Sequence, residues 1–291
     1  MDFREMNLRV FQRKTIPHVF FQPRFEPWYA WHETFHCMPE RFQGMSLRDV
    51  YDQMNVSMRT VHYYTGMPDP IRRSFAPEVK IREQEEGMRK TVIYETPFGD
   101  LVEGQKRTQD ETWRTVDFPV KSAEDLRRLR WLYGHMRYDF DHAAFDQGDA
   151  YVGPRGVPSF WVPKSPYQAL AQVWMRLEDL IYALVDCRSE VEETMRVIDE
   201  TYDGLYEQLT AAAGKLQILN FGENLHEALL SPRYLQRYLL PFYEKRSNQL
   251  RQAGIFTHVH LDGYFHSWLK YLKDFPFDGL EALTPTPQGD V

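Results

Sequence analysis

The chain has only two cysteines in 291 residues, Cys37 and Cys187. Two cysteines without a C-x-x-C spacing form no disulfide framework, and they fit a reducing compartment. No stretch approaches the ~18 uncharged apolar residues of a membrane-spanning helix. Residues 1–5 are charged and lack the apolar region of a signal peptide. We therefore predict a cytoplasmic protein with no membrane segment.

The chain also lacks a strong excess of either positive or negative charge. Lys and Arg number 35 and Asp and Glu 42, which gives a net charge of −7 without long runs of either sign. This balance argues against nucleic acid or an anionic membrane as the main partner and favours a small-molecule substrate. Hydrophobic residues make up 43% and aromatic residues 15% of the chain, which is enough for a large buried core. The length is normal for one α/β barrel.

From about residue 150 the sequence alternates between strand and helix patterns. We predict strands at 150–153, 216–222 and 278–283, and helices at 165–184 and from Ser189 to Gly214. Repeated βα units predict parallel strands with right-handed crossovers. The helix after Ser189 has apolar residues at alternating steps of four and three, which predicts a core-facing stripe: Val191, Met195, Ile198, Tyr202, Leu205 and Leu209.

The N-terminal part of the chain is less regular. The sequence predicts a strand at residues 16–22. It also predicts a helix over residues 46–64 that begins at Ser46, in which residues 61–64 could instead form a strand. Residues 78–118 alternate apolar and polar positions between turn signals such as Gly87, which is typical of antiparallel hairpins with one wet face.

These patterns predict a (β/α)8 TIM-type barrel as the fold class. We predict one barrel domain over residues 1–291, with a β-hairpin insertion at 78–118. Only about six barrel strands are recognised, whereas a closed barrel of this type has eight. The prediction is therefore a chain that lacks its last two βα units.

The strongest functional signal is the segment His258-Val259-His260-Leu261-Asp262, which continues a short apolar, β-branched run. Side chains of a strand alternate between its faces, so His258, His260 and Asp262 are expected on one side. Two imidazoles and a carboxylate at the C-terminal end of a barrel strand predict a metal or acid/base site. The alternative is that one histidine is a core residue and Asp262 caps the next helix.

Several motifs occur in an order that resembles the uroporphyrinogen decarboxylase superfamily, which also contains corrinoid-dependent methyltransferases. The motifs are Phe221-Gly222-Glu223-Asn224, Leu230-Ser231-Pro232, Leu239-Leu240-Pro241-Phe242-Tyr243, His258-x-His260-x-Asp262-Gly263 and Asp278-Gly279-Leu280-Glu281-Ala282-Leu283-Thr284-Pro285. The likeness covers roughly residues 10–291, and the 78–118 segment is similar to the methyltransferase-like branch.

The resemblance implies zinc and a corrinoid carried on a partner protein. Zinc methyltransferases of this superfamily have His-x-Cys where this chain has His260-Leu261-Asp262. His260 therefore matches a ligand position, and Asp262 stands where the family has a thiolate. The family's further cysteine ligand has no counterpart. Because a nitrogen and oxygen site also suits zinc, the metal is expected even though the thiolate is replaced.

Four further positions are candidates for binding or catalysis. Glu223 follows a predicted barrel strand, and its role is either catalysis or capping the loop. Glu281 lies in an apolar run, where a carboxylate needs a metal or a cation beside it. We predict Glu223, Asp262 and Glu281 as catalytic residues. Substrate-binding candidates are Arg24, for an anionic group, together with His258 and Trp28.

Three hypotheses follow. The first is a metal-dependent methyltransferase that uses His260 and Asp262, with a corrinoid protein or a small methyl acceptor as partner. The second is a metal-free, decarboxylase-like lyase in which Asp262 or Glu223 acts as acid or base and Arg24 binds a carboxylate. The third is a non-catalytic, incomplete barrel that binds a ligand or a partner.

Overall fold

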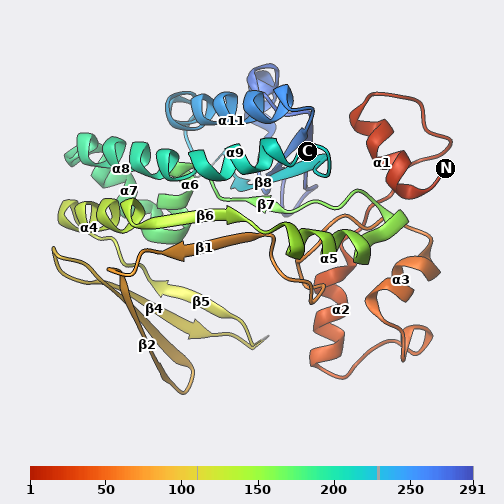
Figure 1. Ribbon diagram of the computed structural model, residues 1–291, viewed down its shortest axis with the longest axis horizontal. Coiled ribbons are helices and arrows are strands. Elements are labelled where there is room, and N and C mark those ends of the chain that lie inside the picture. The colour runs from red at the N-terminus through yellow and green to blue at the C-terminus, as the bar shows by residue number, and fades with distance from the viewer. Residues whose placement is uncertain (110, 228–229, 291) are drawn as a thin grey trace.

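The structure, a computed structural model, describes residues 1–109, 111–227 and 230–290 and shows a mixed α/β protein (Figure 1). No helix within these ranges combines the length and the apolar character needed to span a bilayer. Figure 1 shows the helices α1 to α3 on one side of the molecule and the sheet of β2 to β5 projecting below the other side.

Regular elements cover most of the described chain. The strands are β1 (Ile71–Phe75), β2 (Lys80–Glu86), β3 (Arg89–Glu95), β4 (Leu101–Arg107), β5 (Trp113–Asp117), β6 (Met136–Phe140), β7 (Trp161–Val162), β8 (Ile218–Leu225), β9 (Phe256–Leu261) and β10 (Gly279–Glu281). The α-helices are α1 (Phe3–Phe11), α2 (Phe25–Thr34), α3 (Leu47–Met54), α4 (Ala123–Gly134), α5 (His142–Val152), α6 (Pro166–Ala169), α7 (Leu177–Asp186), α8 (Arg188–Thr201), α9 (Asp203–Ala211), α10 (Pro232–Tyr234) and α11 (Leu240–Gln252). Short 3-10 segments are η1 (Glu40–Phe42), η2 (Gly153–Arg155) and η5 (His266–Asp274), and π-helical turns are η3 (Leu170–Trp174) and η4 (Leu235–Leu239).

A parallel sheet forms the centre of the C-terminal half. Its four strands follow the order β10-β9-β8-β7, and Thr60 pairs with Ser159 in a further parallel bridge. β8 is buried at four consecutive positions, from Ile218 to Phe221, so both of its faces are covered. The predicted parallel strands are confirmed. A closed eight-stranded barrel is not, since the described parallel strands form an open sheet of four.

Two antiparallel units complete the strands. β1 pairs with β6, and we call this pair the β1/β6 ribbon. The strands β2 to β5 form a four-stranded antiparallel sheet, which confirms the hairpin pattern expected within residues 78–118. One face of this sheet joins the core through Val92, Tyr94 and Leu101, and β2 is exposed along its whole length. The single barrel domain over 1–291 with an insertion at 78–118 stays a prediction.

The helical stripe predicted after Ser189 is confirmed. All six of its apolar residues are buried. The stripe continues across a boundary at Tyr202, where α8 ends and α9 begins, so one predicted helix is two helices with a common buried face.

Three predicted elements were wrong, two of them in the N-terminal part. Residues 16–22 form no strand, and the apolar Val19 and Phe21 are 88% and 59% exposed instead of packing in a sheet. The helix that begins at Ser46 ends at Met54, because Asn55 adopts a left-handed conformation (φ 51°). Further along, residues 150–152 are the end of α5, which begins after the N-cap Asp141, and Gly153 begins η2, so this segment is not a strand.

The helix predicted over 165–184 is also interrupted. It divides into α6, η3 and α7, with Met175 in an extended conformation between the last two. The carbonyl of Trp174 accepts a hydrogen bond from the Val120 backbone at 3.0 Å, and the Trp174 indole donates to the Tyr133 hydroxyl at 2.8 Å. These tertiary contacts replace the continuation of the helix, and they are not visible in local sequence.

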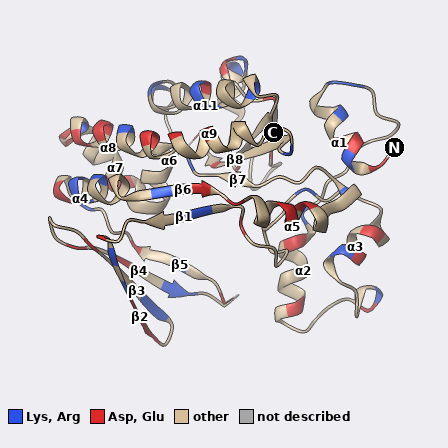
Figure 2. Cartoon of the chain, in the orientation of Figure 1, with Lys and Arg blue, Asp and Glu red and all other residues tan. Residues whose placement is uncertain are grey.

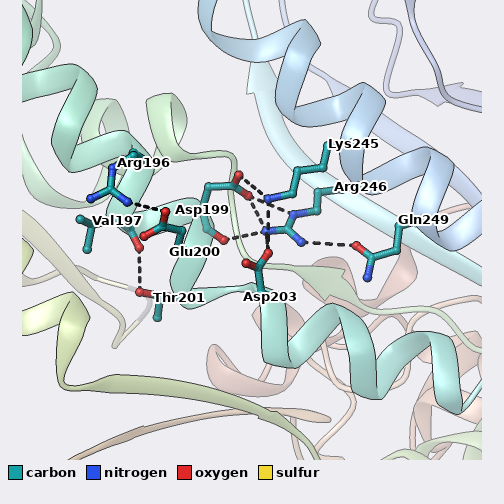
Figure 3. A network of polar contacts seen from close by, with 9 residues as sticks. All are labelled: Arg196, Val197, Asp199, Glu200, Thr201, Asp203, Lys245, Arg246 and Gln249. Carbon is teal, nitrogen blue, oxygen red and sulfur yellow. Dashed lines mark hydrogen bonds and ion pairs between the residues drawn. The ribbon is translucent and has the colours of Figure 1, made fainter.

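Charged residues are distributed over most of the elements, with both signs present on many helices (Figure 2). One group of them is buried. The Arg246 guanidinium, 1% exposed, donates to Asp199 Oδ1 at 3.0 Å and to Asp203 Oδ1 at 2.7 Å (Figure 3). It also lies 4.5 Å above the ring of Tyr206. These contacts join α11 to α8 and α9 and hold the helical layer together.

The Arg246 contacts predict a large loss of stability on truncation. The variant Arg246→Ala should lower the free energy of unfolding by about 2 kcal/mol, because it removes a buried guanidinium that joins three helices, while Lys245 still pairs with Asp199 and Asp203. Urea denaturation measures the loss. Arg196→Ala is the matched control: Arg196 pairs with Glu193 and Glu200 in solvent, so its removal should change stability little. Equal losses in the two variants would contradict the structural role of Arg246.

Candidate functional site

A cavity of about 690 Å³ opens where the parallel strands β7, β8 and β9 end. Carboxyl ends of parallel strands are the usual place for ligand sites in α/β proteins. Among the predicted site residues, Arg24, His260 and Asp262 line this cavity. The cavity lining also includes His62, Tyr63, Asp69, Ile71, Arg73, Tyr133, Tyr138, Trp161, Val162, Lys164, Val173, Trp174, Tyr202, Gly222 and Asn224.

His260 is held in place by Glu281 on the neighbouring strand. The parallel register of β9 and β10 puts these two residues side by side, and His260 Nδ1 lies 2.9 Å from Glu281 Oε1. A carboxylate that pairs with Nδ1 fixes the ring and its tautomer and leaves Nε2 for a ligand. The histidine therefore offers a neutral nitrogen to the cavity that it lines.

Glu281 itself is a buried carboxylate with a full set of partners. Arg59 forms an ion pair with Oε2, and Asn220 Nδ2 donates to Oε1 at 2.8 Å. Arg59 is 7% exposed, and burial lowers its pKa to about 10, so it stays protonated at neutral pH. It also lies beside the buried Glu26 of α2, whose pKa is raised by burial.

His258 and Asp262 lie at different depths along β9. His258 is buried, with Nδ1 at 3.4 Å from Glu281 Oε2 and its ring edge-on to Phe11. Its Nε2 has no hydrogen-bond partner in the described part of the chain. Asp262 follows the strand and is exposed. His258 and His260 thus face the same carboxylate, as strand alternation predicts, and His260 and Asp262 face the cavity.

Burial keeps both histidines uncharged. Burial, together with the neighbouring Arg59 and His260, lowers the pKa of His258 to about 3. Burial, followed by the charge of Arg24, lowers the pKa of His260 to about 4. Because Arg59 balances the charge of Glu281, a neutral imidazole at each position is consistent with the geometry.

Glu223 lies behind the cavity wall, and its contacts are structural. It is fully buried, accepts from the Ser165 backbone at 2.7 Å and from the Tyr243 hydroxyl at 2.7 Å, and also accepts from the Ser165 hydroxyl. These bonds join β8 to the start of α6 and to α11. Glu223 is not among the residues that line the cavity.

Of the two predicted N-terminal residues, only Arg24 reaches the cavity. Its guanidinium lies over Tyr63 at 4.5 Å and near Trp161 at 5.7 Å, and its Nε is buried without a partner among the described residues. Trp28 instead packs on α2 and η1, against Phe42 and His32. Trp28 therefore packs among the N-terminal helices and does not line the cavity.

Sequence reasoning missed several charged or titratable residues around the cavity, and three of them belong to the part of the site described so far. Lys164 follows β7, donates to the Gly222 carbonyl, and has its pKa lowered by burial. His62, whose pKa burial also lowers, lies 3.8 Å from Asp69. Arg59 is the third. Lys164 stands directly before the Ser165-Pro166 helix start, at a strand end, and that position was a usable signal; nothing local marks Arg59 or His62.

A zinc ion fits this arrangement in part. The His260 ring has the carboxylate partner typical of metal-bound histidines, and Asp262 lines the same cavity. Across the described ranges, no group of three or more His, Cys, Asp or Glu side chains is arranged to hold a metal ion. The fit therefore rests on two side chains, one fewer than catalytic zinc sites usually have.

Comparisons with known proteins give one structural likeness. No family model matches the chain, and no curated protein matches it. Among solved structures, a methyltransferase from Methanosarcina mazei is similar with a TM-score of 0.52 and 12% sequence identity, over 96% of this chain and 75% of that one. At this identity the likeness shows a common fold. A methyltransferase-like α/β fold agrees with the resemblance seen in the sequence.

The two buried histidines predict a loss of stability in weak acid. Their folded-state pKa values lie below the unfolded value of about 6.5, so the unfolded state binds more protons as the pH falls from about 6.5 towards 4. The stabilisation is complete above pH 6.5 and decreases below it. Urea denaturation at several pH values measures this slope.

The variant His258→Asn is the control for this prediction. It removes one of the two histidines, so the pH slope should decrease by about 1.4 kcal/mol per pH unit relative to the parent protein. Surface carboxylates contribute equally to both proteins and cancel in the comparison. An unchanged slope would mean that His258 is not held neutral by burial.

Proposed function

We propose that the chain is an enzyme of methyl transfer whose substrate binds in the 690 Å³ cavity. The observation that carries this proposal is the orientation of His260 by Glu281, at a strand end in a methyltransferase-like fold. The motif order that resembles corrinoid-dependent methyltransferases supports the same class. The fold alone does not specify a reaction, so the argument depends on the site.

His260 and Asp262 are the proposed zinc ligands. With these two protein ligands, one fewer than catalytic zinc sites usually have, substrate and water would fill the remaining positions of a tetrahedral ion. Zinc bound there would lower the pKa of a thiol or hydroxyl acceptor and favour its anionic form. In the transfer, the acceptor would lose its proton and form a bond to the methyl carbon, while the cobalt–carbon bond of the donor methylcorrinoid would break and leave its electron pair on cobalt. Glu281 and Arg59 act as positioning residues for His260.

The proposed partner is a protein that carries a corrinoid, and the proposed acceptor is a small molecule. The exposure of Asp262 supports this, because a group at the cavity mouth can be reached from outside. His260 lies deeper, with its side chain 12% exposed. A methyl acceptor bound between the deeper His260 and the exposed Asp262 would present its reacting atom towards the surface.

The metal proposal predicts weak but specific zinc binding. Calorimetric titration of the protein with zinc should give one site, and both His260→Ala and Asp262→Asn should weaken it at least about tenfold, because each removes one of two ligands. His266→Ala is the control, since His266 is exposed and does not line the cavity. Zinc binding that is equal in all four proteins would remove His260 and Asp262 as ligands.

A metal-free lyase is the second candidate, and two cations favour it. Arg24 and Lys164 both line the cavity, where they could hold a substrate carboxylate close to Asp262 as acid or base. Glu223 is less suited to that role because Ser165 and Tyr243 occupy its oxygens.

Chelation separates the two candidates. A lyase predicts that release of carbon dioxide from a carboxylated porphyrinogen continues in strong chelator and is lost in Asp262→Asn. Methyl transfer predicts no such release in either condition. Turnover that survives chelation would therefore replace the first proposal with the second.

A further inference from the structure

The cavity has a second polar wall that lies outside the parallel sheet. Arg73 and Tyr138 face each other across the β1/β6 ribbon and both line the cavity. Tyr133 from α4, Trp174 from η3 and Tyr202, between α8 and α9, complete this wall. None of these residues touches the His260 and Glu281 cluster through a hydrogen bond or an ion pair among the described contacts.

Polar side chains gather along this wall. The Trp174 indole donates to the Tyr133 hydroxyl at 2.8 Å. Tyr138 pairs with Arg73 across the ribbon, and both line the same cavity as Tyr133. A phenol hydroxyl and a guanidinium are both hydrogen-bond donors. Arg73 and Tyr138 can therefore each donate to a ligand bound in the cavity.

This wall offers a positive charge and no carboxylate. The cavity's acidic residues are Asp69 and Asp262. Asp69 already accepts from the Ile71 backbone at 2.8 Å and lies near His62, and Asp262 is at the end of β9. A guanidinium paired across the ribbon with a phenol hydroxyl is a site for an anion with two oxygens, since each donor can meet one oxygen.

Apolar and aromatic side chains lie beside this polar wall. Ile71, Val162 and Val173 line the cavity together with the rings of Trp161, Trp174 and Tyr202. Aromatic rings prefer to stack with other rings, offset or edge-on, and such contacts add to the area that they bury. The chemistry therefore suits a flat ring that carries a carboxylate.

We propose that Arg73 and Tyr138 form a carboxylate subsite, and that the cavity takes an aromatic carboxylic acid. This inference rests on the proposed function only in treating the cavity as the substrate site. The carboxylate binds at the β1/β6 ribbon, and the ring extends over the aromatic wall towards His260. Arg73 is exposed, so the subsite forms part of the cavity mouth.

Binding of benzoate to the full chain tests the subsite without any turnover. Isothermal titration calorimetry should show benzoate binding to the parent protein, and binding about tenfold weaker or less in Arg73→Gln and in Tyr138→Phe, since each loses a bond to a charged group. Benzyl alcohol, the uncharged probe, should bind weakly and equally to all of these proteins.

Arg72→Gln is the matched control. Arg72 is the neighbouring residue on β1, its side chain is 69% exposed, and it pairs with Asp141 outside the cavity. The Arg72→Gln substitution removes a positive charge from the same strand but outside the cavity, so benzoate affinity should be unchanged. Arg24→Gln distinguishes the subsite from the strand-end cations, and it should weaken benzoate less than Arg73→Gln.

Three results would overturn the subsite: no saturable benzoate binding to the parent protein, equal affinity in the parent and Arg73→Gln, or equal losses in Arg72→Gln and Arg73→Gln. Failure of methyl transfer is a separate outcome. If benzoate binding depends on Arg73 and Tyr138 while no methyl transfer is found, the subsite stands and the proposed reaction falls.

Discussion

The ion pair between Glu281 and Arg59 is the interaction on which the candidate site depends. A carboxylate in this position is buried beside two imidazoles, and without a cation it would take up a proton or draw one onto a histidine. Arg59 keeps Glu281 ionised, and Asn220 occupies part of its hydrogen-bonding capacity. Glu281 can then fix His260 while both histidines stay neutral. A neutral, oriented imidazole is the form that either binds a metal or accepts a proton.

The cavity combines two parts of the fold that have different origins. The ends of β7, β8 and β9 supply Lys164, His260 and Asp262, as expected for a parallel α/β sheet. The β1/β6 ribbon, which is antiparallel and lies outside that sheet, supplies Arg73 and Tyr138. The first part is placed where chemistry usually occurs in such folds. The sequence of the β1/β6 ribbon can vary without disturbing the parallel sheet. The ribbon is therefore a suitable place for substrate selection.

The parts of this structure that follow local periodicity were predictable. The buried strand with His258 and His260, the α8 and α9 stripe and the hairpins of β2 to β5 all follow repeats of two or of 3.6 residues. The strand expected at 16–22 was wrong because an apolar run needs a partner strand, and the chain offers none there. Arg59 and Arg73 were missed for a related reason. Their importance comes from residues far away in the sequence, Glu281 for Arg59 and Tyr138 for Arg73, which only the tertiary fold brings close.

The depths of His260 and Asp262 limit which reactions suit the site. A reaction that must be shielded from water would need both His260 and Asp262 to be covered, yet Asp262 is exposed at the cavity mouth. A reaction that passes a group from one protein to a bound small molecule has the opposite need, because the reacting atom must remain reachable from outside. His260 anchors the deep side through Glu281, and Asp262 stands at the opening. This difference in depth is the geometry that the proposed transfer from a partner protein to a bound small molecule would use.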